Sequence, residues 1–577
     1  GIQVQNHETV TLDVVMAAQP ALSETVVVGY GILGKKKRHA APKKPLPANQ
    51  KVISTIPKHT PRSEQPQLVI AFEPETYEEK MIWVYSDGSP APSPDSIDPE
   101  YYGEQYDPIL ENPFQKTAQS NISTFSIDVD AASYANIRRF LEDDVLPPAN
   151  AVRIEEMINY FDYDYPKPAG AHPFEINTEV APCPWNPEHK LMLVGLQGQQ
   201  IDVGQLPSAN LVFLIDVSGS MDEADKLPLV IESLNMLTDQ LRSNDKVAIV
   251  VYAGAAGLVL NSTPGNDKRA IKDALAKLNA GGSTAGGAGI QLAYQTARNN
   301  FVPGGNNRVI LCTDGDFNVG VSSEQDLVHL IEKERADGIY LTVLGFGDGN
   351  YQDGKMQNLA DKGNGNHAYI DGLKEAKKVL VQEFGGTVFA IAKDVKLQLH
   401  FNPELLEGYR LIGYENRILA TEDFNDDTKD AGELGVGHRV TALYELVPTG
   451  RPLPPMSKID SALVVVQKPD ASVNIKTSDL MVLQLRYKKP QGDQPSRLME
   501  YRLNAASLDR STMSDNFKLA SAVAEFGLLL RNSKFRGEAS FSRAESRARA
   551  TIGSDVGGYR LELIQLIQKA NELYSNK

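Results

Sequence analysis

The sequence predicts an α/β fold, a doubly wound and mainly parallel sheet, inserted in an antiparallel β-domain. Three observations predict it. Short apolar runs alternate with helix-like stretches between residues 210 and 384, polar and apolar residues alternate from 388 to about 503, and helical spacing begins at 511. Continuous apolar strands separated by helices indicate a parallel sheet covered on both faces. A period of two indicates antiparallel strands.

The parallel sheet is predicted from four apolar runs that are short, rich in β-branched residues and bounded by Gly, Asp or Ser. These runs are residues 211–215, 247–252, 309–312 and 340–346, and the helix-like stretches between and after them are 226–242, 267–279, 287–300, 323–336 and 373–384. Strands alternating with helices of this length are typical of βαβ units.

The chain before residue 205 contains strand-like and helical segments but too few strands for a sheet of its own. We therefore expect these strands to join those of 388–503 in one β-domain. A Pro-rich stretch with 13 prolines between residues 42 and 113 precedes them, and such a segment buries too little apolar surface to fold. The predicted parts are 1–31 (strand-like), 32–118 (disordered linker), 119–205 (α+β segment), 206–387 (α/β domain), 388–505 (β-domain) and 506–577 (helical region).

Composition excludes several classes of protein. A chain of 577 residues should hold three or four domains. Its net charge of −16 argues against nucleic-acid binding, which needs clustered basic residues. The sequence contains no run of 18 or more apolar residues, which is the length that a membrane-spanning helix needs. Cys183 and Cys312 are too far apart in sequence and too few for a disulfide framework, and Cys312 should be a buried thiol. Because the chain begins with Gly1, we expect a processed product whose export signal is not visible.

The run Asp216-Val217-Ser218-Gly219-Ser220 follows the first strand of the α/β domain directly. Ligands of open parallel sheets collect at the carboxyl ends of strands. Alternate residues of an extended segment point the same way, so Asp216, Ser218 and Ser220 can converge. One carboxylate and two hydroxyls form an oxygen-only set that suits Mg²⁺, with Mn²⁺ or Ca²⁺ as alternatives.

Two further segments strengthen the prediction of a metal site. The Gly-rich loop 281–287 precedes a helix and offers the hydroxyl of Thr284, and the strand 308–312 ends in a turn that offers Asp314. Both segments lie where a site at the strand ends must be built. The predicted metal ligands are Asp216, Ser218, Ser220, Thr284 and Asp314.

Other chemistries fit the sequence less well. The serines follow a strand, but no G-x-S-x-G nucleophile elbow surrounds them. No H-E-x-x-H motif or cysteine pair indicates zinc, and the 281–289 loop lacks the Gly-Lys-Ser/Thr ending of a phosphate-binding loop. The acidic run 423–430 lacks the glycine and glutamate of an EF-hand and is interpreted as a solvated loop.

The five predicted ligands resemble the metal-ion-dependent adhesion site of von Willebrand factor A domains. That resemblance implies Mg²⁺ held by the two serines and the threonine directly and by the aspartates mostly through water, with an acidic group of a partner completing the octahedron. Residues 120–577 resemble the YfbK-like bacterial von Willebrand A proteins more widely. The matching segments are DVDAASY at 128–134, NLVFLID at 210–216, GFG at 345–347 and AEFGLLL at 524–530.

The first thirty residues carry a separate resemblance. The segment LSETVVVGYG at 22–31 is similar to the end of a carboxypeptidase regulatory-like β-domain of exported Bacteroidetes proteins. This resemblance implies that residues 1–31 are the end of such a domain and that the protein is exported to the periplasm or cell surface.

The sequence therefore predicts a non-enzymatic binding module of the cell envelope, whose metal is completed by a carboxylate of an unknown protein partner. The resemblance adds that metal ligation shifts the domain's last helix, about 373–384. Two alternatives stay open: a structural envelope scaffold stabilised by the metal, and a serine hydrolase acting through Ser218 or Ser220.

Overall fold

The computed structural model describes residues 67–72, 79–84 and 90–91, and residues 104–576 except 283–285, 316–323, 350, 384–388, 430, 456–472 and 491–494. It divides into two compact units, Gly1–Tyr102 and Gly103–Lys577. The expectations for residues 1–31 lie outside the described residues. In the first unit, the strands β1 (Gln67–Phe72), β2 (Glu79–Val84) and β3 (Pro90–Ala91) form an antiparallel sheet.

The α/β domain is built on a six-stranded sheet in the order β10-β9-β8-β11-β12-β13. Its strands are β8 (Ala209–Asp216), β9 (Lys246–Tyr252), β10 (Ala256–Pro264), β11 (Asn306–Thr313), β12 (Ile339–Phe346) and β13 (His367–Ile370). All neighbours are parallel except β9 and β10. This confirms the mainly parallel, doubly wound sheet.

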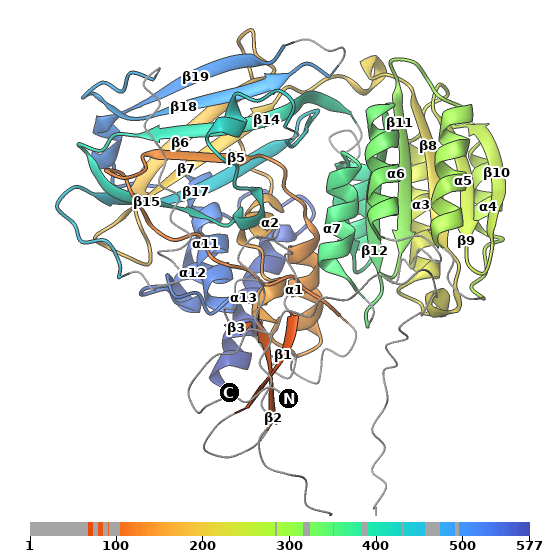
Figure 1. Cartoon of the computed structure of the whole chain (residues 1–577), viewed down its shortest axis with the longest axis horizontal. Helices are drawn as coiled ribbons and strands as arrows, with labels where there is room; N and C mark the ends of the chain where they lie inside the picture. Colours follow the sequence, from red (N-terminus) through yellow and green to blue (C-terminus); the bar gives the residue numbers. More distant parts are fainter. Residues whose placement is uncertain are drawn as a thin grey trace, which may run out of the picture. The chain divides into compact units, whose positions relative to one another are not determined.

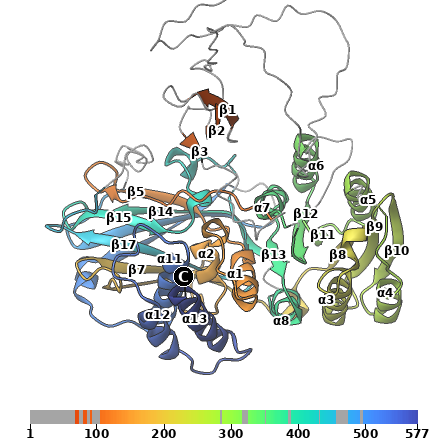
Figure 2. The ribbon, with the colours of Figure 1, turned by 90° about the horizontal axis from the view of Figure 1, so that it is seen from below.

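Helices cover both faces of this sheet, as Figure 2 shows. One face carries α3 (Leu227–Gln240), α4 (Lys268–Leu275) and α8 (Leu373–Lys377), the last continued by a π-helical turn, Lys378–Gln382. The other face carries α5 (Gly286–Asn299), α6 (Glu324–Ala336) and α7 (Asp353–Lys362). The side chains of β8 alternate between these two cores: Leu211, Phe213 and Ile215 pack in one, and Val212 and Leu214 in the other.

Three elements of this domain were not predicted. The strand β10 has mostly half-exposed or exposed residues, so it lacks the continuous apolar run by which the other strands were recognised. The strand β13 is only four residues long. The helix α7 has few apolar residues; three of them, Met356, Leu359 and Ala360, are buried.

The antiparallel domain is a sandwich of two sheets (Figure 1). One sheet has the order β16-β14-β18-β19, with β5 paired to β14, and the other has the order β4-β15-β17-β7-β6. The strands before the α/β domain are β4 (Gln115–Lys116), β5 (Ile122–Ser126), β6 (Phe174–Pro182) and β7 (Lys190–Gly198). Those after it are β14 (Ala390–Phe401), β15 (Leu406–Ile412), β16 (Leu434–Gly435), β17 (Arg439–Pro448), β18 (Asp479–Lys488) and β19 (Arg497–Asn504).

The pairing of early with late strands confirms that the α/β domain is inserted in the β-domain. β5 pairs with β14, and β7 pairs with β17 through the register Leu193↔Leu443. Alternate residues of β7 serve two cores: Met192 and Val194 lie between the two sheets, whereas Leu191 and Leu193 face the helices.

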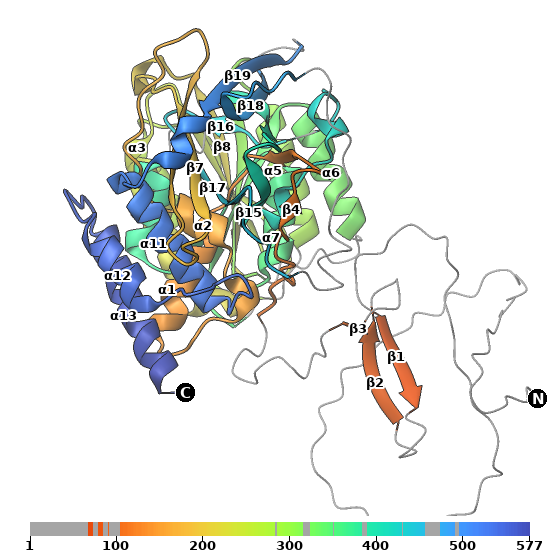
Figure 3. The same cartoon turned by 90° about the vertical axis from the view of Figure 1, so that its left-hand side faces the viewer.

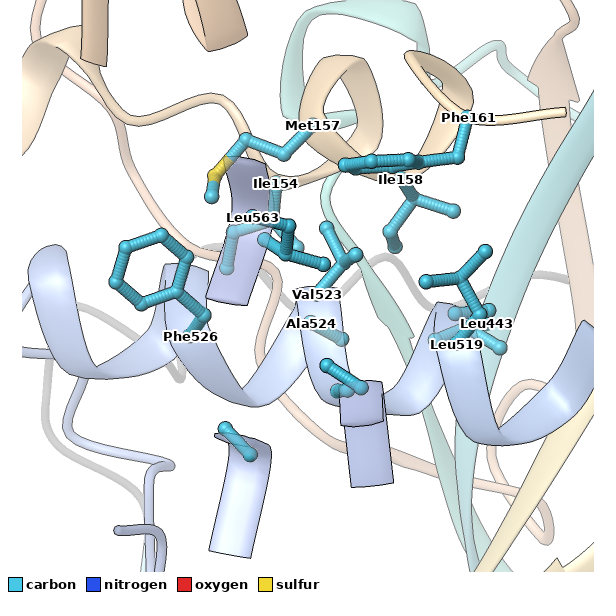
Figure 4. Packing of buried hydrophobic residues seen from close by; sticks show 14 of the residues in the cluster. Ile154, Met157, Ile158, Phe161, Leu443, Leu519, Val523, Ala524, Phe526 and Leu563 are labelled. Atoms are coloured by element: carbon cyan, nitrogen blue, oxygen red, sulfur yellow. The ribbon is translucent and has the colours of Figure 1, made fainter. Parts of the chain in front are cut away.

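The helices on the outer face of the second sheet come from the segments before and after the inserted α/β domain. They are α1 (Ala132–Glu142), α2 (Ile154–Asn159), α11 (Asp515–Leu530), α12 (Phe541–Arg549) and α13 (Tyr559–Ser575), and Figure 3 shows the last three side by side. In Figure 4, Val523 and Phe526 of α11 lie against Ile154 and Met157 of α2. The helical C-terminal region is thus part of the core that closes the sandwich.

Two boundaries differ from the expectations. The alternating run Ser126-Ile127-Asp128-Val129-Asp130 predicts a short strand, but the strand is placed at Ile122–Ser126, because the buried pairing with β14 ends at Ser126. Residues 104–118 belong to the packed unit and not to an extended linker: Gln105 N donates to Tyr351 O at 2.9 Å and β4 pairs with β15. Neither segment has a long apolar run that would have signalled burial. In the described chain, no helix is long and apolar enough to cross a membrane.

Candidate metal centre

The strand order brings the first predicted ligand to the centre of the sheet. Asp216 is the last residue of β8, which lies between β9 and β11. The registers Asp216↔Tyr252 and Ile215↔Cys312 place Asp216 and Asp314 at the carboxyl ends of neighbouring parallel strands. The two aspartates, nearly a hundred residues apart in sequence, therefore lie at one edge of the sheet, as the sequence predicted.

The two serines lie in the turn that follows β8. Ser218 N donates to Asp216 Oδ1 at 2.8 Å, which orients the carboxylate, and Ser218 Oγ lies 3.1 Å from Ser220 Oγ. Ser218 is 2% exposed whereas Ser220 is exposed. The site therefore has a buried side at the two aspartates and opens to solvent at Ser220.

The loop that carries Thr284 is tied to this turn at its described end. Gly281 N donates to Val217 O at 2.8 Å, and Gly219 N donates to Gly282 O at 3.1 Å. Thr284 itself lies outside the described residues, so its position as a ligand stays a prediction. The three segments singled out from the sequence are nonetheless neighbours at the same edge of the sheet.

Buried carboxylate oxygens without partners are the main feature of the site. Asp216 and Asp314 are both 0% exposed. By strict hydrogen-bond geometry, Oδ2 of Asp216 and both oxygens of Asp314 have no donor among the described residues, although the Tyr252 hydroxyl acts on Asp216 closely enough to lower its pKa. An unpaired carboxylate taken out of water costs several kcal/mol, so a cluster of three such oxygens favours a bound cation.

Burial shifts the protonation of the first ligand. Loss of solvent raises the pKa of Asp216 to about 6, the hydrogen bonds from Ser218 oppose the shift, and the nearby carboxylate of Asp314 adds to it. The negative charge at this position is therefore unfavourable until a cation balances it.

Sequence reasoning missed Lys226, which reaches the site from the start of α3. Its Nζ lies 3.7 Å from Asp314 Oδ2, and the side chain is 5% exposed. Gly347 has φ +70°, and a Cβ there would lie 2.4 Å from Lys226 Cγ and Cε. Gly347 thus leaves room for the lysine stem. The available signal was a Gly after β12 and a Lys six residues after Ser220, but their meeting depends on the sheet order.

The residues present fit a hard divalent cation. The side chains at the site offer carboxylate and hydroxyl oxygens, which are the donors that Mg²⁺ and Ca²⁺ prefer. The unpaired oxygens of Asp216 and Asp314 supply negative charge, and the solvent-facing Ser220 leaves one side open. Lys226 places one positive charge beside this set without filling it.

The serines lack the contact that a serine hydrolase requires. Ser218 Oγ and Ser220 Oγ bond to each other, and neither bonds an imidazole within the described part of the chain. A nucleophilic serine needs a base within hydrogen-bond reach. The geometry favours ligation over nucleophilic attack.

A second acidic group lies on the surface nearby in the fold, after β8 and after β12. Glu223, Asp225 and Asp348 each offer one carboxylate oxygen, and these oxygens lie within 4.8 Å of one another. None of the three was predicted. Exposed acidic groups are commonly solvated and need no metal. We therefore use this surface triad (Glu223, Asp225 and Asp348) as a control for metal binding at the buried site.

The chain matches three family profiles. One described as von Willebrand factor type A domain matches residues 210–382, one described as von Willebrand factor matches 100–193, and one described as the C-terminal part of uncharacterized protein YfbK matches 386–573. The chain therefore contains a von Willebrand factor type A domain, which includes Asp216, Ser218, Ser220, Thr284 and Asp314.

Two curated relatives are similar to parts of this chain. The uncharacterized protein YfbK of Escherichia coli (strain K12) is 41% identical over 477 residues, which cover 81% of each chain. The uncharacterized protein sll0103 of Synechocystis sp. is 31% identical over 180 residues, which cover 30% of this chain and 40% of the relative.

Two solved structures overlap the chain with low TM-scores. The conserved hypothetical protein BatB from Bacteroides thetaiotaomicron is 24% identical and covers 31% of this chain and 97% of its own, with a TM-score of 0.27. A von Willebrand factor type A protein from Catenulispora acidiphila is 16% identical and covers 68% of this chain and 89% of its own, with a TM-score of 0.37.

Proposed function

Since the chain belongs to the YfbK family of von Willebrand factor A proteins, we propose that it is a metal-dependent protein-binding module. Asp216, Ser218, Ser220, Thr284 and Asp314 would hold one Mg²⁺, with Mn²⁺ or Ca²⁺ as substitutes. A carboxylate of a partner protein would complete the coordination. The observation that carries the proposal is the group of three buried carboxylate oxygens of Asp216 and Asp314, for which the described residues supply a single charged neighbour, Lys226 Nζ at 3.7 Å from Asp314 Oδ2.

The metal would supply positive charge that attracts and orients an anionic group of the partner. The chain's own residues determine where that charge lies. Ser218 N fixes one oxygen of Asp216, and Lys226 balances part of the charge of Asp314 when no metal is bound. The exposed Ser220 leaves the approach from solvent open.

The last helix of the domain is linked to the C-terminal helices through Arg138. Glu375 of α8 accepts a hydrogen bond from Arg138 Nη2 of α1 at 2.8 Å, and Arg138 Nη1 donates to Glu562 of α13 at 2.9 Å. We propose that a shift of residues 373–384 on ligation would act on the C-terminal helices through Arg138. Such two-position helix shifts are a known form of switching.

The test is capture of a partner from envelope extract with immobilised full chain. We expect capture in about 2 mM Mg²⁺, a concentration above the roughly 10⁻⁴–10⁻³ M dissociation constants at which extracellular modules hold Ca²⁺, and its loss in EDTA and in Asp216→Asn. A protein that keeps its partner in EDTA but loses melting temperature would instead be the metal-stabilised scaffold. Equal capture by wild type and Asp216→Asn in Mg²⁺ would contradict the proposal.

Because its first residues resemble those of exported proteins, we also propose that the protein acts outside the cytoplasm. We also propose that the protein binds its partner without catalysing a reaction. A fluorophosphonate probe that labelled Ser218 or Ser220 would support the hydrolase alternative.

A further inference from the structure

A polar cavity lies between the α/β domain and the β-sandwich. Its volume is about 360 Å³, and its wall includes residues of β11, α6 and α7 on one side and of β5, β14 and β16 on the other. Ligand pockets have volumes of roughly 300–1,000 Å³. Arg308 in this wall is the third residue of β11, about 20 Å along the strand from Asp314. The cavity is therefore separate from the metal site.

Arg308 is a buried cation without a carboxylate partner. The residue is 3% exposed. Its Nη1 donates to Thr342 Oγ1 at 2.7 Å, its guanidinium carbon lies 5.5 Å from the centre of the Tyr340 ring, and its Nε has no acceptor. Burial lowers the pKa of Arg308 and the negative charge of Glu433 opposes that shift, but this carboxylate lies 3.6 Å from Lys393 and accepts a hydrogen bond from Asn364.

The other buried arginines show that this situation is unusual in the molecule. Arg138, Arg153, Arg410 and Arg531 are also buried, and each has a carboxylate oxygen within 3.3 Å. Arg308 has none within 4.0 Å among the described residues. Because a buried charge without a partner costs several kcal/mol, its retention beside a cavity indicates that an anion from outside the chain is its partner.

The other arginines and the lysine of the cavity wall already have partners, and Arg335 Nη1 donates to Asn364 Oδ1 at 3.2 Å. Arg417 contacts Asp361 at 2.7 Å and Asp128 at 3.3 Å. Lys362 lies 3.2 Å from Glu332. Arg308 therefore lies beside acids that are held by other groups and has no carboxylate partner of its own among the described residues.

We infer that this cavity binds a small polar carboxylate, held by Arg308. The planar guanidinium offers parallel donors that match the two oxygens of a carboxylate. Four acidic side chains line the cavity (Asp128, Glu332, Asp361 and Glu433) and would repel a phosphate dianion more strongly than a monoanion. The cavity-lining amides of Asn358 and Asn366 suit a ligand that also carries a hydroxyl or amino group.

Calorimetric titration of the metal-free full chain, in EDTA, with glycolate and with glycine tests this inference, with sodium chloride at equal ionic strength as the reference; without metal, the probes have no cation to bind at the Asp216 site. We expect one saturable site per chain for at least one of the two probes. Arg308→Met should weaken binding at least tenfold. Arg308→Lys keeps the charge but loses the fork, and should weaken binding several-fold; it decides the question if the Met variant fails to fold.

Three outcomes would overturn the inference: no saturable binding of either probe, equal binding by wild type and Arg308→Lys, or tighter binding of inorganic phosphate than of both carboxylates. Asp216→Asn is the matched control and should bind the probes as wild type does, because the metal site is separate. A failure of the metal proposal would therefore leave this result unchanged.

Discussion

Asp130 and Asp314 are both buried aspartates in the same folded unit, but their surroundings differ. Asp130 is 3% exposed; its Oδ1 accepts His367 N at 2.8 Å, and its Oδ2 accepts Gln357 Nε2 and lies 3.0 Å from Arg417 Nη2. Asp314 is 0% exposed and accepts no hydrogen bond from any described residue, with only Lys226 at 3.7 Å. The first carboxylate is complete without a ligand, whereas the second is not.

We propose that this difference separates a structural acid from a metal-binding acid. Around Arg417, three aspartates (Asp128, Asp130 and Asp361) share one guanidinium that joins β5, α7 and the turn after β15. At the ends of β8 and β11, one of the two aspartates, Asp314, lies 3.7 Å from Lys226 Nζ, a longer distance. Burial alone does not distinguish these carboxylates; at Asp216 and Asp314, several unpaired oxygens of two neighbouring acids lie together.

The largest effect is expected from removing the cation of the complete cluster. Arg417→Met leaves buried aspartates uncompensated, and should lower the free energy of unfolding by about 3–5 kcal/mol. Urea denaturation measures it. The matched control is Arg451→Met, whose exposed pair with Glu188 should contribute less than about 1 kcal/mol. Equal stability of the two variants would remove the basis of the comparison.

The next effect concerns the incomplete cluster in metal-free protein. The pKa of Asp216 is about 6 when folded, against 3.8 as the ordinary value. The folded state therefore holds the proton more tightly, and the resulting stability is present below about pH 4 and lost as pH rises through 6. Two pKa units correspond to about 3 kcal/mol.

Denaturation in EDTA at several pH values measures this effect as a difference between proteins. The stability of wild type relative to Asp216→Asn should fall by up to about 3 kcal/mol between pH 4 and pH 7. Groups that titrate equally in both proteins cancel. A difference that stays constant with pH would show that Asp216 is not a strained carboxylate.

A smaller effect is expected at Lys226. Two unit charges about 4 Å apart interact by about 4 kcal/mol at an effective dielectric of 20, so an ammonium beside Asp314 should oppose a divalent cation. Lys226→Met keeps a stem of similar shape beside Gly347 and should tighten Mg²⁺ binding about tenfold, or 1.4 kcal/mol. Weaker binding in calorimetry would mean that Lys226 supports the site.

The smallest effect is expected from the surface triad. Glu223→Gln, Asp225→Asn and Asp348→Asn together remove three exposed charges that are screened at physiological salt. We expect the Mg²⁺ affinity to change by less than about threefold, as calorimetric titration would show. Loss of the binding in this triple variant would move the metal from the buried site to the surface.

The sequence predicted much of the fold because period and burial agree over long segments. The apolar strands ending at Asp216 and Cys312 and the alternation in 395–401 were sufficient for the parallel sheet and for the insertion. The short strand β13, the half-exposed strand β10 and the polar helix α7 carry too weak a pattern, and the packing of residues 104–118 depends on distant partners such as Tyr351.

The candidate site was partly readable for a similar reason. Asp216, Ser218 and Ser220 lie in one short run, so their spacing alone suggests convergence. The roles of Lys226 and Arg308 could not be predicted in this way. Lys226 reaches Asp314 only because the fold brings α3 to the end of β11, and Arg308 was singled out because it has no carboxylate partner among the described residues. The absence of a contact in the folded protein produces no pattern in the sequence, so it could not be predicted.

The most direct test of the account is calorimetric titration of the metal-free full chain with Mg²⁺, with Asp216→Asn and Asp314→Asn in parallel. The account predicts one site per chain in wild type and loss of that binding in both variants, which stay folded. Equal binding of Mg²⁺ by wild type and both variants would contradict the assignment of the metal to Asp216 and Asp314.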